Sequence, residues 1–203
     1  MNLLKKLFGL DKDEIWRQLS EEMKARFLEG NWRKGSRVQV DAGEWTVTLD
    51  IHTVSAGHSH QQYTRLRAPY VNRDGFRFTV YRKGFFSGIA KSFGMQDVEV
   101  GYPDFDEIFI VKGNDEAKLR SLFGNRRIRE LLEAQPKVHL EVKDNEGLFG
   151  PKFPEDVDEL CFQVLGVIRD IPQLKQLFEL FAEVLQQLCH IGSAYEKDPN
   201  LEL

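Results

Sequence analysis

The sequence predicts an α+β protein: an antiparallel meander followed by mixed strands and helices, with a C-terminal helix packed on the sheet. Three observations indicate this class. Apolar and polar residues alternate between residues 36 and 83, with the period of half-buried strands. Residues 160–168 are apolar on both faces of an extended chain, which is typical of an interior strand. Residues 170–191 carry the broadest helical apolar face, and we expect that helix to cover the sheet.

The chain divides into four predicted parts. Residues 1–35 form an N-terminal helical arm, residues 36–95 the meander, residues 96–195 an α+β part closed by the C-terminal helix, and residues 196–203 a frayed tail. Residues 36–195 are also compatible with one domain, because a chain of 203 residues can bury the core of one large domain or of two small ones.

Two amphipathic segments are predicted at the N-terminus. Residues 1–10 place their apolar side chains on one side of a helix, beside two lysines. We expect this segment to pack on its own domain or on a partner, and weak contact with a membrane surface is the alternative. Residues 12–29 carry a clearer apolar stripe, which predicts a longer helix. Its members are Ile15, Trp16, Leu19, Met23 and Phe27.

The first half of the predicted meander is a hairpin around the turn 41–44. The alternation on either side of this turn is self-consistent. Closing the turn with Val40 opposite Trp45 also brings Val38 opposite Val47, so that four apolar side chains share one face. The sequence therefore predicts two paired strands with a polar outer face.

A second hairpin is predicted around the loop 71–75. This register places Ala68 opposite Phe78 and Leu66 opposite Val80 on the inner side. The outer side then interleaves cationic side chains with aromatic rings, as proteins that bind single-stranded nucleic acid do. The predicted binding residues are Tyr63, Arg65, Arg67, Arg77, Tyr81 and Lys83. The alternative is a sheet face that is solvated, or covered by the N-terminal helix.

Residues 103–123 predict a strand that passes directly into a helix. Residues 108–111 are a continuous apolar run, as expected for a strand covered on both faces. Asn114 is the predicted helix cap, because its side chain can accept from backbone N–H groups of the next turn. The face that packs on the sheet is Leu119, Leu122 and Phe123.

The last third of the chain contains the clearest patterns. Residues 138–142 alternate as a strand, and the apolar run from Leu160 predicts the interior strand. Asp170 and Pro172 mark the start of the C-terminal helix, and Gly192 marks its end.

The net charge of −4 is unevenly distributed. The first 95 residues hold 16 Lys and Arg and 10 Asp and Glu, a net charge of +6. The remaining residues hold 12 and 22, a net charge of −10. Such asymmetry indicates either a basic binding surface or two regions that attract each other. An overall pI of about 5.8 argues against a nucleic-acid-binding module, because such modules are usually basic.

The sequence predicts a cytoplasmic location. It has no apolar stretch long enough to span a bilayer, and residues 1–10 lack a secretion-signal pattern. Cys161 and Cys189 stand alone in apolar surroundings, without the spacing of a metal site or redox motif. We therefore expect two buried thiols rather than a disulfide or a nucleophile.

Catalytic chemistry has little support in the sequence. The phosphate-binding loop, the dinucleotide-binding turn, the serine-hydrolase elbow and the HExxH zinc motif are absent. A histidine group and a carboxylate group are the nearest candidates, and a polar connection and a solvated strand end explain them better. They are His52, His58 and His60, and Asp104, Asp106 and Glu107. No catalytic residue, metal ligand or cofactor is predicted.

Three segments carry a resemblance to a known family: DVEVGYPDFDEIFIVKGND, KVHLEVKD and FELFAEVLQQLCHIGSAYEKDP. With them, most of the chain after about residue 60 resembles a family of uncharacterised bacterial cytosolic proteins. The resemblance implies a bacterial source and a compact α+β domain. It implies no activity and no functional residues.

The leading functional prediction is a non-enzymatic cytoplasmic protein that binds a protein partner or itself. Missing catalytic motifs and the amphipathic N-terminus motivate it. The alternative is a binder of an anionic ligand or nucleic acid through the outer face of the second hairpin. A hydrolase or metal-dependent enzyme that uses the acidic or histidine group is the third possibility.

Overall fold

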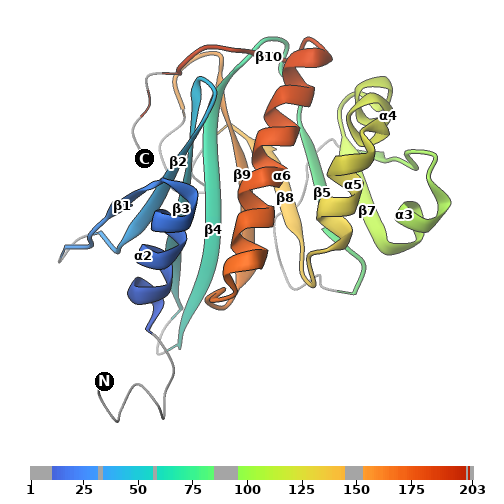
Figure 1. The fold of residues 1–203 in the computed structure, drawn as a ribbon. Coiled ribbons are helices and arrows are strands. Elements are labelled where there is room, and N and C mark those ends of the chain that lie inside the picture. The colour runs from blue at the N-terminus through green and yellow to red at the C-terminus, as the bar shows by residue number, and fades with distance from the viewer. Residues whose placement is uncertain are drawn as a thin grey trace.

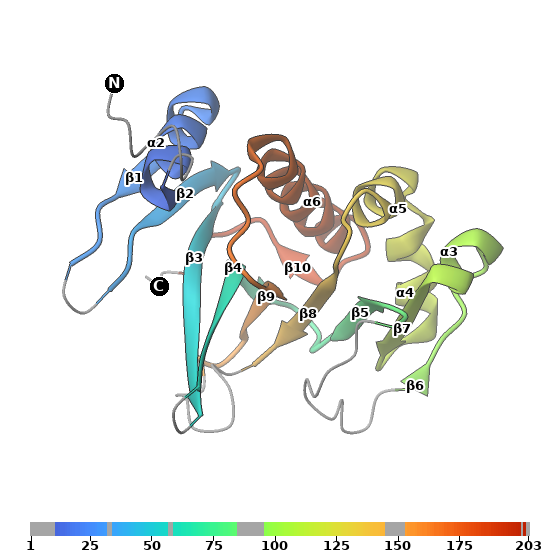
Figure 2. The ribbon, with the colours of Figure 1, turned by 90° about the horizontal axis from the view of Figure 1, so that it is seen from below.

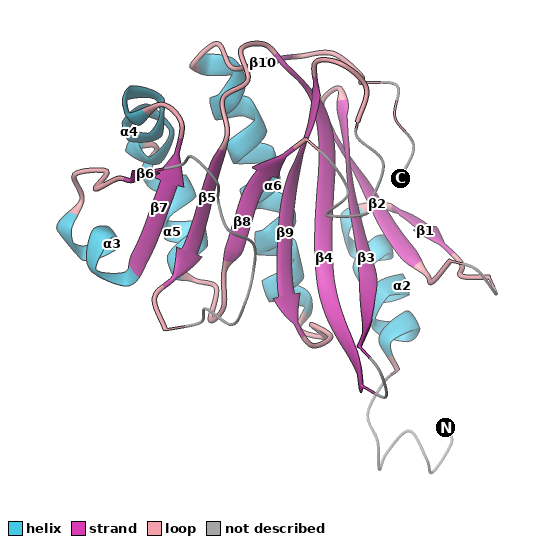
Figure 3. Ribbon diagram, turned by 180° about the vertical axis from the view of Figure 1, so that it is seen from behind, coloured by secondary structure: helices cyan, strands magenta, loops and turns pink. Residues whose placement is uncertain are grey.

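A computed structural model describes residues 11–31, 34–56, 59–84, 96–144, 153–199 and 201. The described chain forms one large antiparallel sheet with helices on one face, which confirms the predicted α+β class (Figure 1). Seen from behind, the other face of the sheet carries no helix of the described chain (Figure 3). The predicted amphipathic segment at residues 1–10 lies outside the described residues.

The sheet has ten strands in the order β1-β2-β3-β4-β9-β8-β5-β7-β6, with β10 paired to β4. The strands are β1 (Arg26–Leu28), β2 (Arg37–Ala42), β3 (Trp45–Ala56), β4 (Ser59–Asn72), β5 (Phe78–Arg82), β6 (Gln96–Asp97), β7 (Phe109–Gly113), β8 (His139–Lys143), β9 (Val157–Leu165) and β10 (Ala194–Tyr195). The helices are α2 (Lys12–Met23), α3 (Pro103–Ile108), α4 (Glu116–Gly124), α5 (Arg126–Glu133) and α6 (Ile171–His190).

One row of apolar side chains crosses the sheet beneath the helices. Successive strand pairs place these residues side by side: Leu49, Leu66, Phe162, Leu140, Val80 and Val111. All of them are buried. Helix α6 lies over this row, as the sequence predicts (Figure 1). Its start is also as predicted, because Asp170 caps it by accepting from the N–H of Gln173 at 2.7 Å, and Pro172 follows.

The first helix ends earlier than the sequence predicts. Lys24 adopts a left-handed conformation with φ of 55°, which terminates α2 after Met23. The chain then forms the edge strand β1, in which Phe27 pairs with Val38. The prediction of a helix up to residue 29 is therefore wrong. Phe27 still packs against the core, but from a strand.

The first hairpin forms with a register two residues away from the predicted one. Val40 pairs with Val47 and Val38 with Leu49, so the predicted pairing with Trp45 is wrong. The turn has two residues and begins at Gly43, whose φ of +66° is readily adopted by glycine. The shorter turn shifts the register by two, which keeps the same residues on the apolar face.

The second predicted hairpin does not form. Leu66 pairs with Phe162 and Ala68 with Leu160, so β4 is the neighbour of β9 and not of β5. Strands β9 and β8 lie between β4 and β5. Alternation identifies which face of β4 is buried, but it does not identify the neighbour, because any apolar strand satisfies it.

The region around residues 103–123 is confirmed in part. Its strand, β7, is preceded by helix α3, and Ile110 is only half-buried, so the prediction of burial on both faces is wrong. Asp115, not Asn114, caps α4, and it accepts from the N–H of Lys118 at 3.0 Å. The predicted apolar face of this helix is fully buried: Leu119, Leu122 and Phe123.

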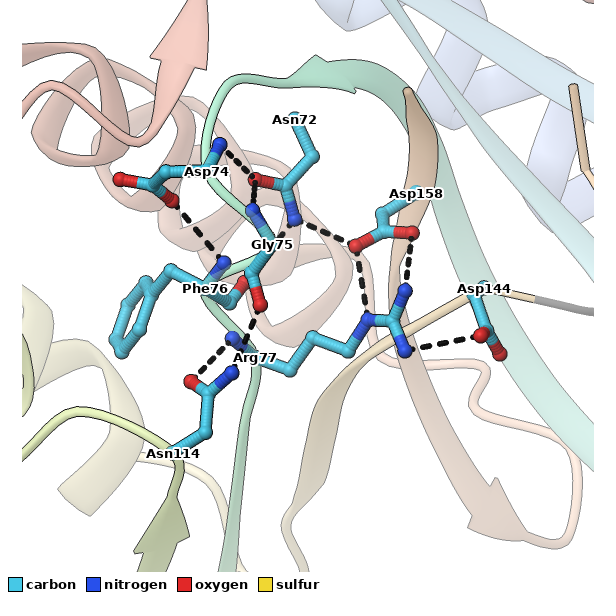
Figure 4. A network of polar contacts seen from close by, with 8 residues as sticks. All are labelled: Asn72, Asp74, Gly75, Phe76, Arg77, Asn114, Asp144 and Asp158. Carbon is cyan, nitrogen blue, oxygen red and sulfur yellow. Dashed lines mark hydrogen bonds and ion pairs between the residues drawn. The ribbon is translucent and has the colours of Figure 1, made fainter. Parts of the chain in front are cut away.

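The connection from β4 to β5 passes the ends of β9 and β8, and Arg77 holds it there (Figure 4). Its guanidinium donates two hydrogen bonds to Asp158 of β9, at 3.0 and 3.2 Å. A third goes at 2.9 Å to Asp144, the residue after β8. Asn72 at the end of β4 donates to the same Asp158 carboxylate at 2.5 Å. One acidic side chain thus joins both ends of the crossing.

The crossing turn is closed by further side-chain bonds to its own backbone. The Asn72 side chain accepts from the N–H of Gly75 at 3.0 Å, and Asp74 accepts from the N–H of Phe76 at 3.0 Å. Asn114, which follows β7, accepts from the N–H of Arg77 and donates to the carbonyl of Gly75 (Figure 4). Strands β4, β9 and β7 therefore meet at this turn.

We expect Arg77→Ala to lower the free energy of unfolding by about 2–3 kcal/mol, because it removes charge-assisted hydrogen bonds from a largely buried carboxylate. Urea unfolding measures this change. The matched control is Arg126→Ala, whose exposed pair with Glu130 should be worth about 0.5 kcal/mol or less. Equal losses in the two variants would contradict a structural role for Arg77 at the crossing.

Candidate functional site

The six predicted binding residues do not form one surface. Tyr63, Arg65 and Arg67 lie on β4, whereas Tyr81 lies on β5. Because β9 and β8 lie between these strands, the two groups are roughly 14 Å apart. Arg77 precedes β5 and is bonded at the crossing, and Lys83 follows β5.

The polar groups of this set have partners within the protein. Arg65 makes two hydrogen bonds to Asp50, and Arg67 donates to the same carboxylate at 2.7 Å. Lys83 donates to the carbonyl of Asp106 at 2.8 Å. An anionic ligand would have to compete with these oxygen atoms. Binding of an anion or nucleic acid at this face therefore stays a prediction.

A chain of charges crosses the sheet on the face away from the helices. Arg67 of β4 lies between Asp50 of β3 and Glu159 of β9, whose carboxylate is 3.7 Å from its guanidinium. Lys143 of β8 lies on the other side of Glu159, at 3.1 Å. Arg67 from the basic first half of the sequence thus pairs with an acid from the second half. Some of the excess positive charge of the first half therefore forms ion pairs with acids of the second half.

The two carboxylates of this chain of charges have opposite pKa shifts. Burial disfavours the charge on Asp50, but hydrogen bonds from Arg65 and the charges of both arginines outweigh it and lower the pKa. Glu159 is fully buried, and Lys143 and Arg67 are the cations close to its carboxylate. Burial therefore raises the pKa of Glu159, although Lys143 and Arg67 oppose the shift.

The cysteines and histidines give no support to catalysis or metal binding within the described chain. Burial raises the pKa of Cys161 to about 12, so this thiol is unreactive at neutral pH. His52 pairs with Tyr63 and His60 with Ser55, which places the two imidazoles on opposite faces of the hairpin. His58 lies outside the described residues, and no group of three His, Cys, Asp or Glu among the described residues is arranged to hold a metal ion.

Asp104, Asp106 and Glu107 belong to a helix and not to the start of a strand. They lie in α3, where Asp106 accepts hydrogen bonds from the N–H groups of Val100, Gly101 and Tyr102. This carboxylate therefore bonds the preceding turn to the helix.

Among the helices of the described residues, none has the length and apolar character needed to cross a membrane.

The hairpin β3–β4 extends beyond its neighbours in the sheet. Pairing of β2 with β3 ends at Leu49, and pairing of β9 with β4 ends at Thr64. Residues 51–56 and 59–62 therefore form a projecting two-stranded segment, which we call the hairpin tip. Figure 2 shows that the hairpin tip bends toward the side of the sheet away from the helices. The sequence predicted a polar connection at residues 56–62, whereas residues 59–62 belong to strand β4.

The β3 side of the hairpin tip has no neighbouring strand among the described residues. We call this side, residues 51–56, the free edge. Its sequence IHTVSA contains no Asp, Glu, Lys, Arg or Pro. His52 adds no charge at neutral pH, because burial and the nearby Arg65 lower its pKa. Val54 is 40% exposed. Proteins usually place charged residues or proline on such edges, which prevents pairing with another chain. The free edge has neither.

The backbone groups on the free edge follow from the strand register. Gly166 donates to the carbonyl of Gln62 and accepts from the N–H of Thr64, so these β4 residues point their backbone groups away from β3. Their partners across the hairpin, Thr53 and Ile51, must then point theirs away from β4. By the same alternation, Ser55 points outward. The free edge presents the N–H and C=O groups of three residues.

An open cleft of about 450 Å³ lies between the hairpin tip and the residues that follow β9. None of its lining residues is Asp, Glu, Lys or Arg: Thr53, His60, Gln61, Gln62, Leu165, Gly166 and Val167. Leu165 is 52% exposed beside it. Neither strand of the hairpin tip contains Asp, Glu, Lys or Arg. The lack of Asp, Glu, Lys and Arg in residues 51–62 was visible in the sequence. The unequal strand lengths that expose the edge were not.

Comparisons with known proteins reveal a shared fold and no shared family. No protein-family model and no curated protein matches the sequence. Among solved structures, the chain is similar to the mycobacterial trehalose monomycolate transport factor A, TtfA, with a TM-score of 0.53 and 8% sequence identity. The similarity covers 87% of this chain and 94% of that chain. At this identity it shows the fold alone, and the family resemblance in the sequence stays a prediction.

The opposite pKa shifts predict opposite responses to acid. Asp50→Asn should lower the free energy of unfolding by about 3 kcal/mol at pH 7, because two arginines lose their shared carboxylate. The folded pKa lies below the usual value of 3.8, so this stabilisation is present above that value and is lost as the pH falls through the folded pKa. The difference between wild type and variant should therefore shrink in acid, as measured by urea unfolding.

Glu159→Gln is the matched comparison. The pKa of Glu159 in the folded protein lies above the usual value of 4.5, so protonation of this side chain stabilises the fold. This stabilisation is fully present below pH 4.5 and is lost as the pH rises through the folded pKa. The stability of wild type relative to this variant should grow as the pH falls. If both substitutions change the pH dependence in the same direction, the assignment of the two carboxylates is wrong.

Proposed function

We propose that this protein binds another polypeptide, which adds an extended strand to the free edge of β3. The observation that supports this proposal most strongly is the unpaired, uncharged edge from Ile51 to Ala56. Strand addition uses main-chain hydrogen bonds for affinity and alternate side chains for specificity. It needs no catalytic group, which agrees with the prediction of a non-enzymatic protein. We place the interaction in the cytoplasm, as the sequence predicts.

The ends of the sheet offer a poorer site. Strand β1 has three residues and carries Arg26, and β6 has two residues and includes Asp97. Short, charged edges of this kind discourage pairing. The free edge is longer, and three of its residues point backbone groups outward. An exposed edge of this kind is a template for pairing with another chain, which favours a binding role.

The free edge is held in place by the ion pair at its base. Asp50 and Arg65 are directly opposite each other in the β3–β4 ladder, at the point where the hairpin leaves the sheet. A site on paired strands is more rigid than one on a loop, and less ordering entropy is lost when a partner binds. The solved neighbour contributes its fold alone to this proposal.

Extended peptides selected by phage display against the wild-type chain should bind the free edge. We expect Thr53→Pro to abolish their binding, because proline removes an outward N–H and leaves the bonds between β3 and β4 intact. Fluorescence anisotropy of the selected peptides measures the loss.

Val54→Lys and Gln61→Lys form the matched control pair, since these residues face each other across the hairpin but only Val54 lies on the β3 strand. Lysine at Val54 should weaken peptide binding, and lysine at Gln61 should leave it nearly unchanged. Peptides that bind the Thr53→Pro variant as tightly as wild type would contradict the proposed function.

A further inference from the structure

We infer that the strand added to the free edge is the same edge of a second copy of this chain. This inference rests on the proposed function and names its partner. An antiparallel strand pair is self-complementary, because each edge offers the same alternation of N–H and C=O groups. The free edge also lacks charges, so two copies can approach without repulsion between like side chains.

The outward backbone groups select one register. Ile51, Thr53 and Ser55 point outward, so they must pair with one another in the second copy. A two-fold axis at Thr53 places Thr53 opposite Thr53 of the second copy, and Ile51 opposite Ser55. Each of these pairs exchanges two backbone hydrogen bonds. An axis at His52 or Val54 leaves one outward residue of each copy without a pair inside the free edge.

The side chains in this register are compatible. Thr53 meets its own copy at the axis, and threonine pairs are favourable across antiparallel strands. On the other face, His52 lies opposite Val54 of the second copy. Asp50 lies opposite Ala56 of the second copy, so its bonds with Arg65 and Arg67 are kept. No two like charges face each other.

No described strand occupies the place beside the free edge where a second strand would lie. Strand β2 stops pairing with β3 at Leu49, before the free edge begins. Figure 2 shows α2 and α6 on the opposite side of the sheet from the hairpin tip. Since the two-fold contact uses this edge of both copies, assembly stops at a dimer. One pair of strands buries less area than a standard interface, so we expect a micromolar or weaker dissociation constant.

Sedimentation velocity of the full chain, between about 1 and 200 µM, tests for this dimer. We expect reversible dimerisation of wild type and of Gln61→Lys. Thr53→Pro should raise the dissociation constant about thirtyfold or more, because each copy loses one central hydrogen bond. A chain that stays monomeric over this range overturns the inference. If selected peptides still bind the free edge in that case, the proposed function stands without self-pairing.

Disulfide trapping tests the register without relying on the proline variant. In a Cys189→Ser background, Thr53→Cys should form an intermolecular disulfide under mild oxidation, because paired residues lie about 5.5 Å apart between Cα atoms. Val54→Cys should not, since its two copies are diagonal neighbours about 7–8 Å apart. Trapping through Val54 but not Thr53 overturns the register, and trapping through neither overturns the inference.

Discussion

Arg77 links the connection between β4 and β5 to the two strands that lie between them. The chain leaves β4, passes the ends of β9 and β8, which come later in the sequence, and re-enters the sheet as β5. Its guanidinium bonds Asp158 and Asp144, which belong to the two inserted strands. Asn72 binds the same Asp158, so the start and the end of the crossing share one carboxylate. Without Arg77, the buried Asp158 carboxylate would lose two charge-assisted hydrogen bonds.

At the opposite end of β4 from this crossing, unequal strand lengths produce the hairpin tip. Strands β3 and β4 are long, whereas β2 and β9 stop at Leu49 and Thr64. The β3 edge of the hairpin therefore leaves the sheet uncovered by the described chain, whereas Gly166 bonds the β4 edge at Gln62. Asp50 and Arg65 close the ladder where it leaves. The same ion pair that stabilises the polar face thus fixes the direction of the free edge, which links the stability of the sheet to the proposed interaction.

Local patterns predicted the elements whose cause is local. Asp170 and Pro172 predicted the start of α6, and the apolar run from Leu160 predicted an interior strand. Strand neighbours were not predictable, because Leu66 can pack equally well against Val80 or Phe162 on an adjacent strand. The end of α2 depends on the left-handed conformation of Lys24, which lysine rarely adopts.

The candidate site was even less visible in the sequence. Arg65 and Arg67 were correctly placed on the polar face, but their shared partner Asp50 comes from another strand. The free edge exists only because neighbouring strands end early. Amide hydrogen exchange by NMR tests it most directly. We expect fast exchange at Thr53 and slow exchange at Val54 in dilute protein, and slower exchange at Thr53 as the protein concentration rises. Slow exchange at Thr53 at every concentration, or fast exchange at Val54, would contradict this expectation.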